Sequence, residues 1–233
     1  TSSFTKVNPV CANINDGSIT IVPGGVPGYT YTLTGPGGPY TQATATFSNL
    51  APGTYNYSFT DGNGCTGTGG PVVLTTNPAL AITVTLTMPL CNGNSNGIIV
   101  LAASGGVAPY EYALSPFTAY QPTGTFNNLT AGTYTFRIKD FVGCTKDTTV
   151  TLSEPTLLTA AAFNTAVASC SGNDGTITVT GSGGTTPYQY SINNGSNYQS
   201  TGVFTAPAVG AYPNILVKDA NGCIVTTNTT IIS

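Results

Sequence analysis

The chain has 233 residues, of which 6% are charged, and its formal net charge is −3. Five basic residues are too few to neutralise a phosphate backbone, which excludes nucleic acid as a partner. Because 40% of the residues are hydrophobic and Thr, Val, Ile and Tyr recur throughout, the composition predicts an all-β globular protein. No apolar run approaches the about 20 residues of a membrane helix, and we expect no membrane span. No signal peptide opens the chain, which suggests a processed protein or a segment of a longer one.

One pattern occurs three times at nearly constant spacing. Each copy begins with Phe, passes through Gly-x-Tyr and ends with Asp-x-x-Gly-Cys; the copies occupy residues 47–65, 126–144 and 204–223. Internal repetition takes precedence over chain length in counting domains. We therefore predict three modules, called modules one, two and three below: residues 1–77, 78–154 and 155–233.

Within each module, a turn rich in Asn, Asp and Gly precedes an alternating strand, and a second alternating strand follows a Gly-Gly pair and a Pro. In the first strand, the inward positions are Ile19 and Ile21, Ile99 and Leu101, and Ile177 and Val179. In the second strand, we expect the tyrosines to form the core rather than a ligand-stacking ladder: Tyr29, Tyr31, Tyr110, Tyr112, Tyr188 and Tyr190. The residues between them, Ser191 among them, are expected to face solvent.

A variable stretch follows the second strand, at residues 35–46, 115–125 and 193–203. Loops on a rigid scaffold are where binding residues tend to lie. Tyr40, Tyr120 and Tyr198 occupy matching places in these stretches and are candidate glycan contacts. The favoured interpretation is that their rings pack against the edge of a sheet.

The Leu-x-x-Gly-x-Tyr part of the repeated pattern resembles the tyrosine corner of Ig-like sandwiches, in which the Tyr hydroxyl bonds back to the backbone. Its fold-signature residues are Gly53, Tyr55, Gly132, Tyr134, Gly210 and Tyr212. The third copy carries Pro207 near the Leu position and one extra residue before Asp219, which predicts a β-bulge. The pattern predicts antiparallel Ig-like β-sandwich modules.

The junctions between modules each contain a Pro and no Gly, which is typical of a stiff connection. We therefore expect an extended row of modules. The segment Ala160–Ala162 has helical composition, but its alignment with residues 79–87 favours a strand.

Six cysteines occur, two in each module: Cys11, Cys65, Cys91, Cys144, Cys170 and Cys223. Metal sites usually have closely spaced cysteines or histidines, and this chain has neither. The economical prediction is one disulfide inside each module, Cys11 with Cys65, Cys91 with Cys144, and Cys170 with Cys223. Such a bond would stabilise a module by about 4 kcal/mol and indicates an extracellular protein.

Catalysis is not expected, because the chain contains no His and its cysteines are paired in this interpretation. The recurring acidic residues lie in Asp/Asn/Gly turns. Oxygen-rich turns of this kind can bind calcium, which makes Asp16, Asp61, Asp174 and Asp219 weak candidates for ligands. The favoured interpretation is that these side chains cap their own backbone, and we expect no cofactor.

Taken as an ordered set, these motifs resemble the SprB repeat of Bacteroidetes cell-surface proteins. The set consists of Cys before an Asp/Asn-Gly turn, Gly-Gly, Pro-x-Tyr-x-Tyr, Phe-x-x-Leu-x-x-Gly-x-Tyr and Asp-x-x-Gly-Cys. The resemblance covers nearly the whole chain. It implies a large repetitive adhesin, displayed outside the cell after type IX secretion and, in gliding bacteria, moved by the motility machinery.

The leading hypothesis is a non-catalytic, disulfide-stapled stalk in a surface adhesin, with neighbouring repeats as its partners. A second hypothesis is an array that binds surface polysaccharide through many weak contacts. A third is a filament subunit that self-associates by strand addition at a sheet edge.

Overall fold

All regular elements that the structure describes are β-strands. The structure is a computed structural model that describes residues 2–166, 175–205, 207, 210–227 and 230–232. Its strands form antiparallel sheets, which confirms the all-β prediction. Within the described residues, no helix has the length and hydrophobicity needed to cross a membrane. By compactness the chain divides into two units: residues 1–83, 101–124 and 135–148, and residues 84–100, 125–134 and 149–233.

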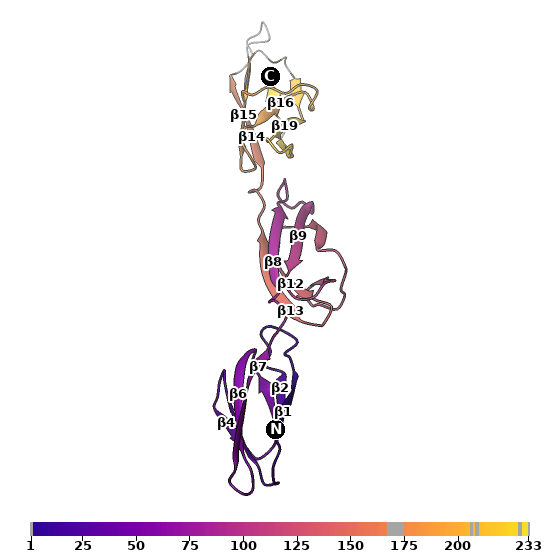
Figure 1. The fold of residues 1–233 in the computed structure, drawn as a ribbon. Coiled ribbons are helices and arrows are strands. Elements are labelled where there is room, and N and C mark those ends of the chain that lie inside the picture. Colours follow the sequence, from indigo (N-terminus) through magenta and orange to yellow (C-terminus); the bar gives the residue numbers. More distant parts are fainter. Residues whose placement is uncertain (1, 167–174, 206, 208–209, 228–229, 233) are drawn as a thin grey trace. The chain divides into compact units, whose positions relative to one another are not determined.

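Module one is a sandwich of two sheets (Figure 1). One sheet has the strand order β1-β2-β5, and the other has the order β4-β3-β6-β7. Side chains from both sheets, such as Ile19 of the first and Tyr55 of the second, pack in one core. This arrangement is an antiparallel β-sandwich of the Ig-like kind. The strands are β1 (Ser3–Val7), β2 (Gly17–Val22), β3 (Thr30–Thr34), β4 (Tyr40–Gln42), β5 (Thr46–Leu50), β6 (Gly53–Thr60) and β7 (Thr66–Leu74).

Modules two and three repeat these strand orders in the described residues, except that their second sheets have three strands and no counterpart of β4. Module two has sheets β8-β9-β11 and β10-β12-β13, and module three has β14-β15-β17 and β16-β19-β20. Every sheet takes its strands from a single module. The strands of module two are β8 (Ala81–Thr87), β9 (Gly97–Ser104), β10 (Glu111–Leu114), β11 (Thr125–Leu129), β12 (Gly132–Lys139) and β13 (Thr145–Leu152). Those of module three are β14 (Thr159–Ala166), β15 (Thr176–Ser182), β16 (Gln189–Ser191), β17 (Val203–Thr205), β18 (Gly210–Tyr212), β19 (Ile215–Lys218), β20 (Ile224–Thr227) and β21 (Thr230–Ile232).

The period-2 pattern of the first strand correctly identified the core. All six predicted inward positions are at most 3% exposed: Ile19, Ile21, Ile99, Leu101, Ile177 and Val179. The Ala-rich segment Ala160–Ala162 lies in β14 and pairs with β15, so the strand prediction for it is confirmed. The burial of the six core positions follows from side chains alternating between the two faces of a strand.

The tyrosines of the second strand also line the core. Tyr31 and Tyr112 are 4% and 7% exposed, and Tyr188 and Tyr190 pack partly buried against the core of module three. The expectation that Ser191 faces solvent is wrong, because this residue is fully buried. Ser191 ends β16, where its hydroxyl donates to Asn193 Oδ1 at 2.8 Å and accepts from the Gly195 amide at 3.0 Å. It therefore organises the following turn instead of meeting water.

The tyrosine corner is present in modules one and two. The Tyr55 hydroxyl donates to the Ala51 carbonyl at 2.8 Å, and the Tyr134 hydroxyl donates to the Thr130 carbonyl at 2.9 Å. Gly53 opens β6 with φ of 149°, a backbone angle that favours glycine. A Cβ atom on Gly53 would also lie only 2.5 Å from Pro36. The corner therefore depends on glycine for both its backbone angle and its space.

Module three departs from the pattern where the sequence indicated a departure. One continuous strand follows the corner in modules one and two, whereas module three has β18 and β19 separated at Pro213 and Asn214. β18 pairs with β21, and β19 pairs with β16 and β20. The irregularity is thus a break in the strand rather than the expected bulge, because proline cannot donate to the ladder. Ala208, which matches Ala51 as the partner of the corner tyrosine, lies outside the described residues.

Candidate functional site

The two disulfides that the structure describes join successive modules. Cys11 is bonded to Cys144, and Cys91 is bonded to Cys223. The predicted pairing of Cys11 with Cys65, and of Cys91 with Cys144, is therefore wrong. Cys65 is a free, exposed thiol. Cys170 was predicted to pair with Cys223 and lies outside the described residues, but Cys223 is already bonded to Cys91.

The position of each cysteine along its sandwich explains this pairing. Cys11 lies in the loop before β2, whose first residue, Gly17, packs against Leu74 at the end of β7. Cys65 lies at the opposite end of β7, immediately before its first residue. Nine residues of strand span roughly 27 Å, whereas disulfide-bonded Cα atoms lie within about 7 Å of each other. The two cysteines of module one therefore cannot meet, and Cys11 pairs instead with Cys144 of the adjoining module.

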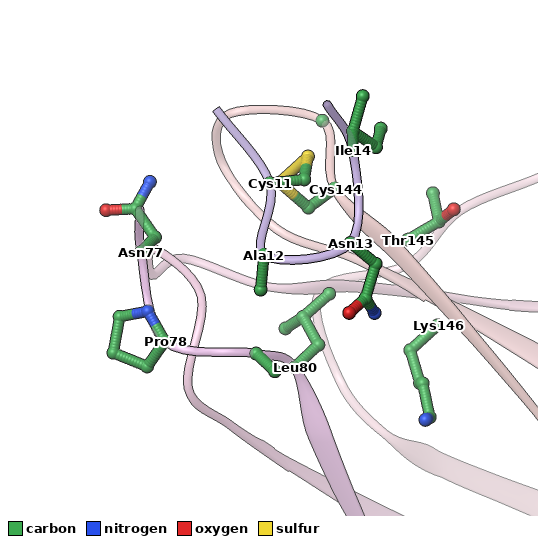
Figure 2. A pocket seen from close by; sticks show the side chains of 12 residues that line it. Cys11, Ala12, Asn13, Ile14, Asn77, Pro78, Leu80, Cys144, Thr145 and Lys146 are labelled. Atoms are coloured by element: carbon green, nitrogen blue, oxygen red, sulfur yellow. A yellow bond between two sulfur atoms is a disulfide. The ribbon is translucent and has the colours of Figure 1, made fainter. Parts of the chain in front are cut away.

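At the first junction, the Cys11 loop of module one lies beside the Cys144 turn of module two (Figure 2). The two Cα atoms are 5.6 Å apart. The Val10 carbonyl, next to the bridge, accepts a hydrogen bond of 3.1 Å from the Asn77 side chain, and Cys144 Sγ lies 3.7 Å from the same oxygen. A hollow of about 280 Å³ adjoins the disulfide, lined by residues 11–14, 77–80 and 143–146. The bridge is thus accompanied by polar contacts from the connecting segment.

The second junction repeats this geometry with different side chains. Cys91 and Cys223 have their Cα atoms 5.7 Å apart. The Leu90 carbonyl, which matches that of Val10, accepts from the Asn221 side-chain amide at 2.9 Å. Glu154, in the connecting segment, accepts from the Asn92 side-chain amide at 2.9 Å and from the Gly93 amide at 2.7 Å. In both junctions, the carbonyl before the first cysteine is therefore an acceptor for a side-chain amide.

The loop that carries each first cysteine is capped by the acidic or amide residue of its turn. Asp16 Oδ1 accepts from the Val10 amide at 3.1 Å, and Asn96 Oδ1 accepts from the Leu90 amide at 3.3 Å. Because Asn substitutes for Asp here, the cap needs an oxygen acceptor rather than a charge. Asp174 holds the matching position in module three and lies outside the described residues.

The turn that carries each second cysteine is built around a buried aspartate. Asp61 Oδ1 accepts from the amides of Asn63 and Cys65 at 2.9 Å each, and Oδ2 accepts from the Val26 amide at 3.3 Å. These hydrogen bonds lower the pKa of the Asp61 carboxyl, and the bond from the Cys65 amide has the largest effect. Gly64 has φ of 81°, which suits glycine at this point of the turn.

The aspartates of the other two modules have the same role. Asp140 and Asp219 are 2% and 3% exposed, and each accepts three backbone amides at 2.8–3.1 Å. Backbone capping therefore accounts for the recurrence of Asp in this motif. Among the residues that the structure covers, no group of three or more His, Cys, Asp and Glu side chains is placed to hold a metal ion. Calcium binding at Asp16, Asp61 or Asp219 stays a prediction.

The three candidate glycan-contacting tyrosines are all partly buried and engaged in contacts within their own modules. The Tyr40 hydroxyl donates to the Pro36 carbonyl at 3.0 Å, and its ring packs against the core of module one. The Lys139 ammonium lies 4.4 Å from the ring centre of Tyr120, and the Lys218 ammonium lies 4.2 Å from that of Tyr198. These cation–π contacts occupy one face of each ring.

A small ionic cluster accompanies Tyr120 in module two. Lys139 pairs with Glu111 at 2.7 Å, and this hydrogen bond raises the pKa of Lys139. Arg137 makes two hydrogen bonds of 2.7 and 2.8 Å to Asp147, which lower the pKa of Asp147 and raise that of Arg137. The pairs cross strands β10, β12 and β13 on a partly exposed face, so they stabilise the sheet modestly.

Sequence reasoning missed the junction residues Asn77, Glu154 and Asn221. It also missed the pairing partner of each cysteine. A usable signal was present, since each module's first cysteine precedes the strand after the Asn/Asp/Gly turn (β2, β9 or β15), and the second precedes the strand after the Asp-x-x-Gly turn (β7, β13 or β20). Tracing the antiparallel order of those strands places the two cysteines at opposite ends of the sandwich.

Comparisons with known proteins agree with the repeated motifs. The family model for the SprB repeat matches residues 3–38, 82–119 and 162–197. A comparison with curated proteins gives no match.

Three of the solved structures that resemble this chain share little sequence with it. The first is the C-terminal 282-residue fragment of intimin in complex with the translocated intimin receptor intimin-binding domain, at 18% identity and a TM-score of 0.37, with the match covering 68% of this chain and 65% of that chain. The second comprises the N-terminal four Ig domains of Dscam1 isoform 4.44, at 12% identity and a TM-score of 0.31, covering 100% of this chain and 75% of that chain. The third comprises the fibronectin(III)-like modules of Clostridium thermocellum CbhA, at 13% identity and a TM-score of 0.27, covering 65% of this chain and 95% of that chain. The match thus spans less than two thirds of the intimin fragment. The fold assignment rests on the sheets and tyrosine corners described above.

The extracellular character of SprB repeats agrees with the two disulfides, since such bonds persist outside the cytoplasm. The three matched segments fall one in each module and include the first cysteine and the second-strand tyrosines of that module. The chain therefore contains three segments that match the SprB repeat, one in each module.

Proposed function

We propose that this chain is a non-catalytic segment of an extracellular adhesin displayed at the cell surface, in which disulfides between repeats make the array resistant to extension. The observation that carries the proposal is that both described disulfides join the first cysteine of one repeat to the second cysteine of the next. Type IX export and gliding motility, which the family resemblance implies, are the setting we propose for it. Neighbouring repeats are its proposed partners.

The covalent topology gives this proposal its mechanical content. The bridges close sequence separations of 133 and 132 residues, and the two closed loops overlap between Cys91 and Cys144. The shortest covalent path from Cys11 to Cys223 therefore contains only the segment from Cys91 to Cys144 and two bridges. At about 3.6 Å per residue, this path limits the extension to ~190 Å, whereas the backbone alone would allow ~760 Å. A pulled chain would thus remain short even after its sandwiches unfold.

We also propose that the chain has no catalytic activity. It contains no His to act as a base, and the recurring buried aspartates hold backbone amides rather than a reactive group. Each repeat has instead a sandwich core, a capped turn and a junction cysteine. These features support a structural role in which function depends on the connection between repeats.

Single-molecule pulling from the two ends tests the mechanical proposal. We expect the oxidised chain to reach an extension between Cys11 and Cys223 of ~190 Å, and the same chain with its disulfides reduced to reach ~760 Å. The Cys65→Ser variant is the matched control and should behave as the unmodified chain does, because Cys65 is not bonded. An oxidised chain that extends as far as the reduced chain would refute a mechanical role for the bridges.

A further inference from the structure

One end of module two has an exposed aromatic ring beside a hollow. Phe141 is 72% exposed, more than any other large hydrophobic residue that the structure describes. The hollow has a volume of about 360 Å³ and is lined by Pro109, Glu111, Lys139 and residues 140–143, which include Phe141. A hollow of this volume is within the size range of small-ligand sites.

The strand register brings the lining residues together. β10 and β12 are antiparallel neighbours in which Glu111 lies opposite Lys139. Pro109 shortly precedes β10, and the turn of residues 140–143 directly follows β12. Because neighbouring antiparallel strands run in opposite directions, the start of one and the end of the other lie at the same end of the sheet. The hollow is therefore built from one sheet and the turn beside it, all within module two.

The backbone of this turn does not need an aromatic residue. The Phe141 amide donates to the Val107 carbonyl at 2.9 Å, and in module three the matching Ala220 amide donates to the Thr185 carbonyl at 2.8 Å. Gly62 holds the same position in module one. Since Ala and Gly form the same turn, the fold does not explain the exposed ring.

Glu111 and Lys139 provide hydrogen-bonding groups of both signs beside this ring. Glu111 Oε2 lies 2.7 Å from the Lys139 ammonium, and the two side chains are 49% and 36% exposed. Among the described residues, Glu111 Oε1 has no hydrogen-bond partner, and the ammonium keeps further N–H groups after this ion pair. The opposite charges of the pair cancel, so the hollow has hydrogen-bonding capacity without a net charge.

We propose that this hollow binds one neutral pyranose unit of a polysaccharide. The apolar C–H face of the sugar stacks on the Phe141 ring, one sugar hydroxyl donates to Glu111 Oε1, and another accepts from the Lys139 ammonium. An acidic sugar fits less well, because its carboxylate meets that of Glu111. Tyr120, the glycan contact that the sequence predicted in module two, is not among the lining residues, and its ring lies beside the Lys139 ammonium.

A sugar suits the hollow better than a protein partner does. A stable protein interface covers about 800 Å² on each partner and has an apolar centre, whereas here one ring is bordered by a charged pair. The inference is separate from the mechanical role proposed above, because none of the sugar-contacting residues belongs to a disulfide. The binding experiment and the pulling experiment can therefore fail independently.

The test uses the full-length chain on an array of neutral gluco-, manno-, galacto- and xylo-oligosaccharides, followed by calorimetric titration with each oligosaccharide that binds. We expect one site per chain, since module three has Gln189 and Ala220 where module two has Glu111 and Phe141. The Phe141→Ala variant should bind at least about tenfold more weakly, because the ring is the main apolar contact. The Phe141→Tyr variant keeps a ring and should keep binding.

Two further variants control for exposure and for folding. Phe163 is also exposed, at 57%, and lies in module three, so the Phe163→Ala variant should bind as the unmodified chain does. The Glu111→Gln variant should bind severalfold more weakly, because a charged acceptor makes the stronger hydrogen bond. Its thermal melt should stay close to that of the unmodified chain, since glutamine occupies this position in module three.

Four results would overturn the proposal. The first is no binding of any neutral oligosaccharide, and the second is equal binding by Phe141→Ala and the unmodified chain. The third is a preference for oligogalacturonate that weakens with added salt, which would assign the binding to a cation alone. The fourth is self-association that the Phe141→Ala change abolishes while no sugar binds, which would assign the ring to a protein contact.

Discussion

Matched serine variants test the disulfide pairing through stability. The Cys11→Ser/Cys144→Ser double variant removes the bridge that closes a separation of 133 residues. In the chain-entropy model, closing a loop of this length raises the free energy of the unfolded chain by about 5 kcal/mol. The free energy of unfolding of the variant should therefore be lower by about that amount. Cys65 is exposed and unbonded, and the Cys65→Ser variant should therefore change the stability by no more than about 0.5 kcal/mol.

Urea unfolding of the oxidised proteins provides the assay, with circular dichroism following the sheets and tyrosine fluorescence following the cores. The midpoint should fall clearly for the double variant and stay constant for Cys65→Ser. Under strong reductant, the double variant and the unmodified chain should unfold at similar midpoints, because both then lack the bridge. If Cys65→Ser and Cys11→Ser destabilise the oxidised chain equally, the two cysteines share one bond and the reasoning about opposite sandwich ends is refuted.

Two other features of the repeat lead to direct tests. The Tyr55→Phe variant removes the hydroxyl that donates to the Ala51 carbonyl in a fully buried corner, and its free energy of unfolding by denaturant should fall by about 1 kcal/mol. Tyr134 is partly exposed, so the Tyr134→Phe variant should lose less. An equal or greater loss for Tyr134→Phe would contradict a role for burial. The backbone amides hold the pKa of Asp61 below its unfolded value, so its contribution to stability is present above about pH 4 and is lost as the pH falls through the folded pKa. Thermal melts from pH 7 to pH 2 should therefore show a smaller acid-induced loss of stability in the Asp61→Asn variant, and identical pH profiles would contradict this linkage.

Local sequence was sufficient for much of the fold because the signals involved act over a few residues. Alternation along a strand identified Ile19 and Ile177 as core residues, because successive side chains must point to opposite faces. The Leu-x-x-Gly-x-Tyr spacing identified the Tyr55 corner, since glycine and a hydroxyl four residues from its acceptor make a local turn. Ser191 was misplaced because the same alternation ignores where a strand ends and a turn begins.

The candidate site could be predicted only in part. The sequence identified the cysteines, the turn aspartates and the third-repeat irregularity. It did not identify the bonding partners of these residues. Asp140 was recognisable as a turn residue, but its three amide donors come from two separate loops and depend on how the strands are arranged. Likewise, nothing in the spacing of Lys218 and Tyr198 shows that the ammonium covers the ring.

The sequence by itself determined that this protein is built of β-strands, that its motifs recur three times in segments that match the SprB repeat, and that each copy has two cysteines, because repetition, alternation and turn motifs act over short stretches of the chain. Only the tertiary structure decided which cysteines meet. Nearly equal spacings of 53 and 54 residues inside each repeat favoured internal pairs, but sequence separation carries no direction in space. Once β7 places Cys11 and Cys65 at opposite ends of one sandwich, the bond can form only with the adjoining repeat, and a predicted internal staple becomes a link between repeats.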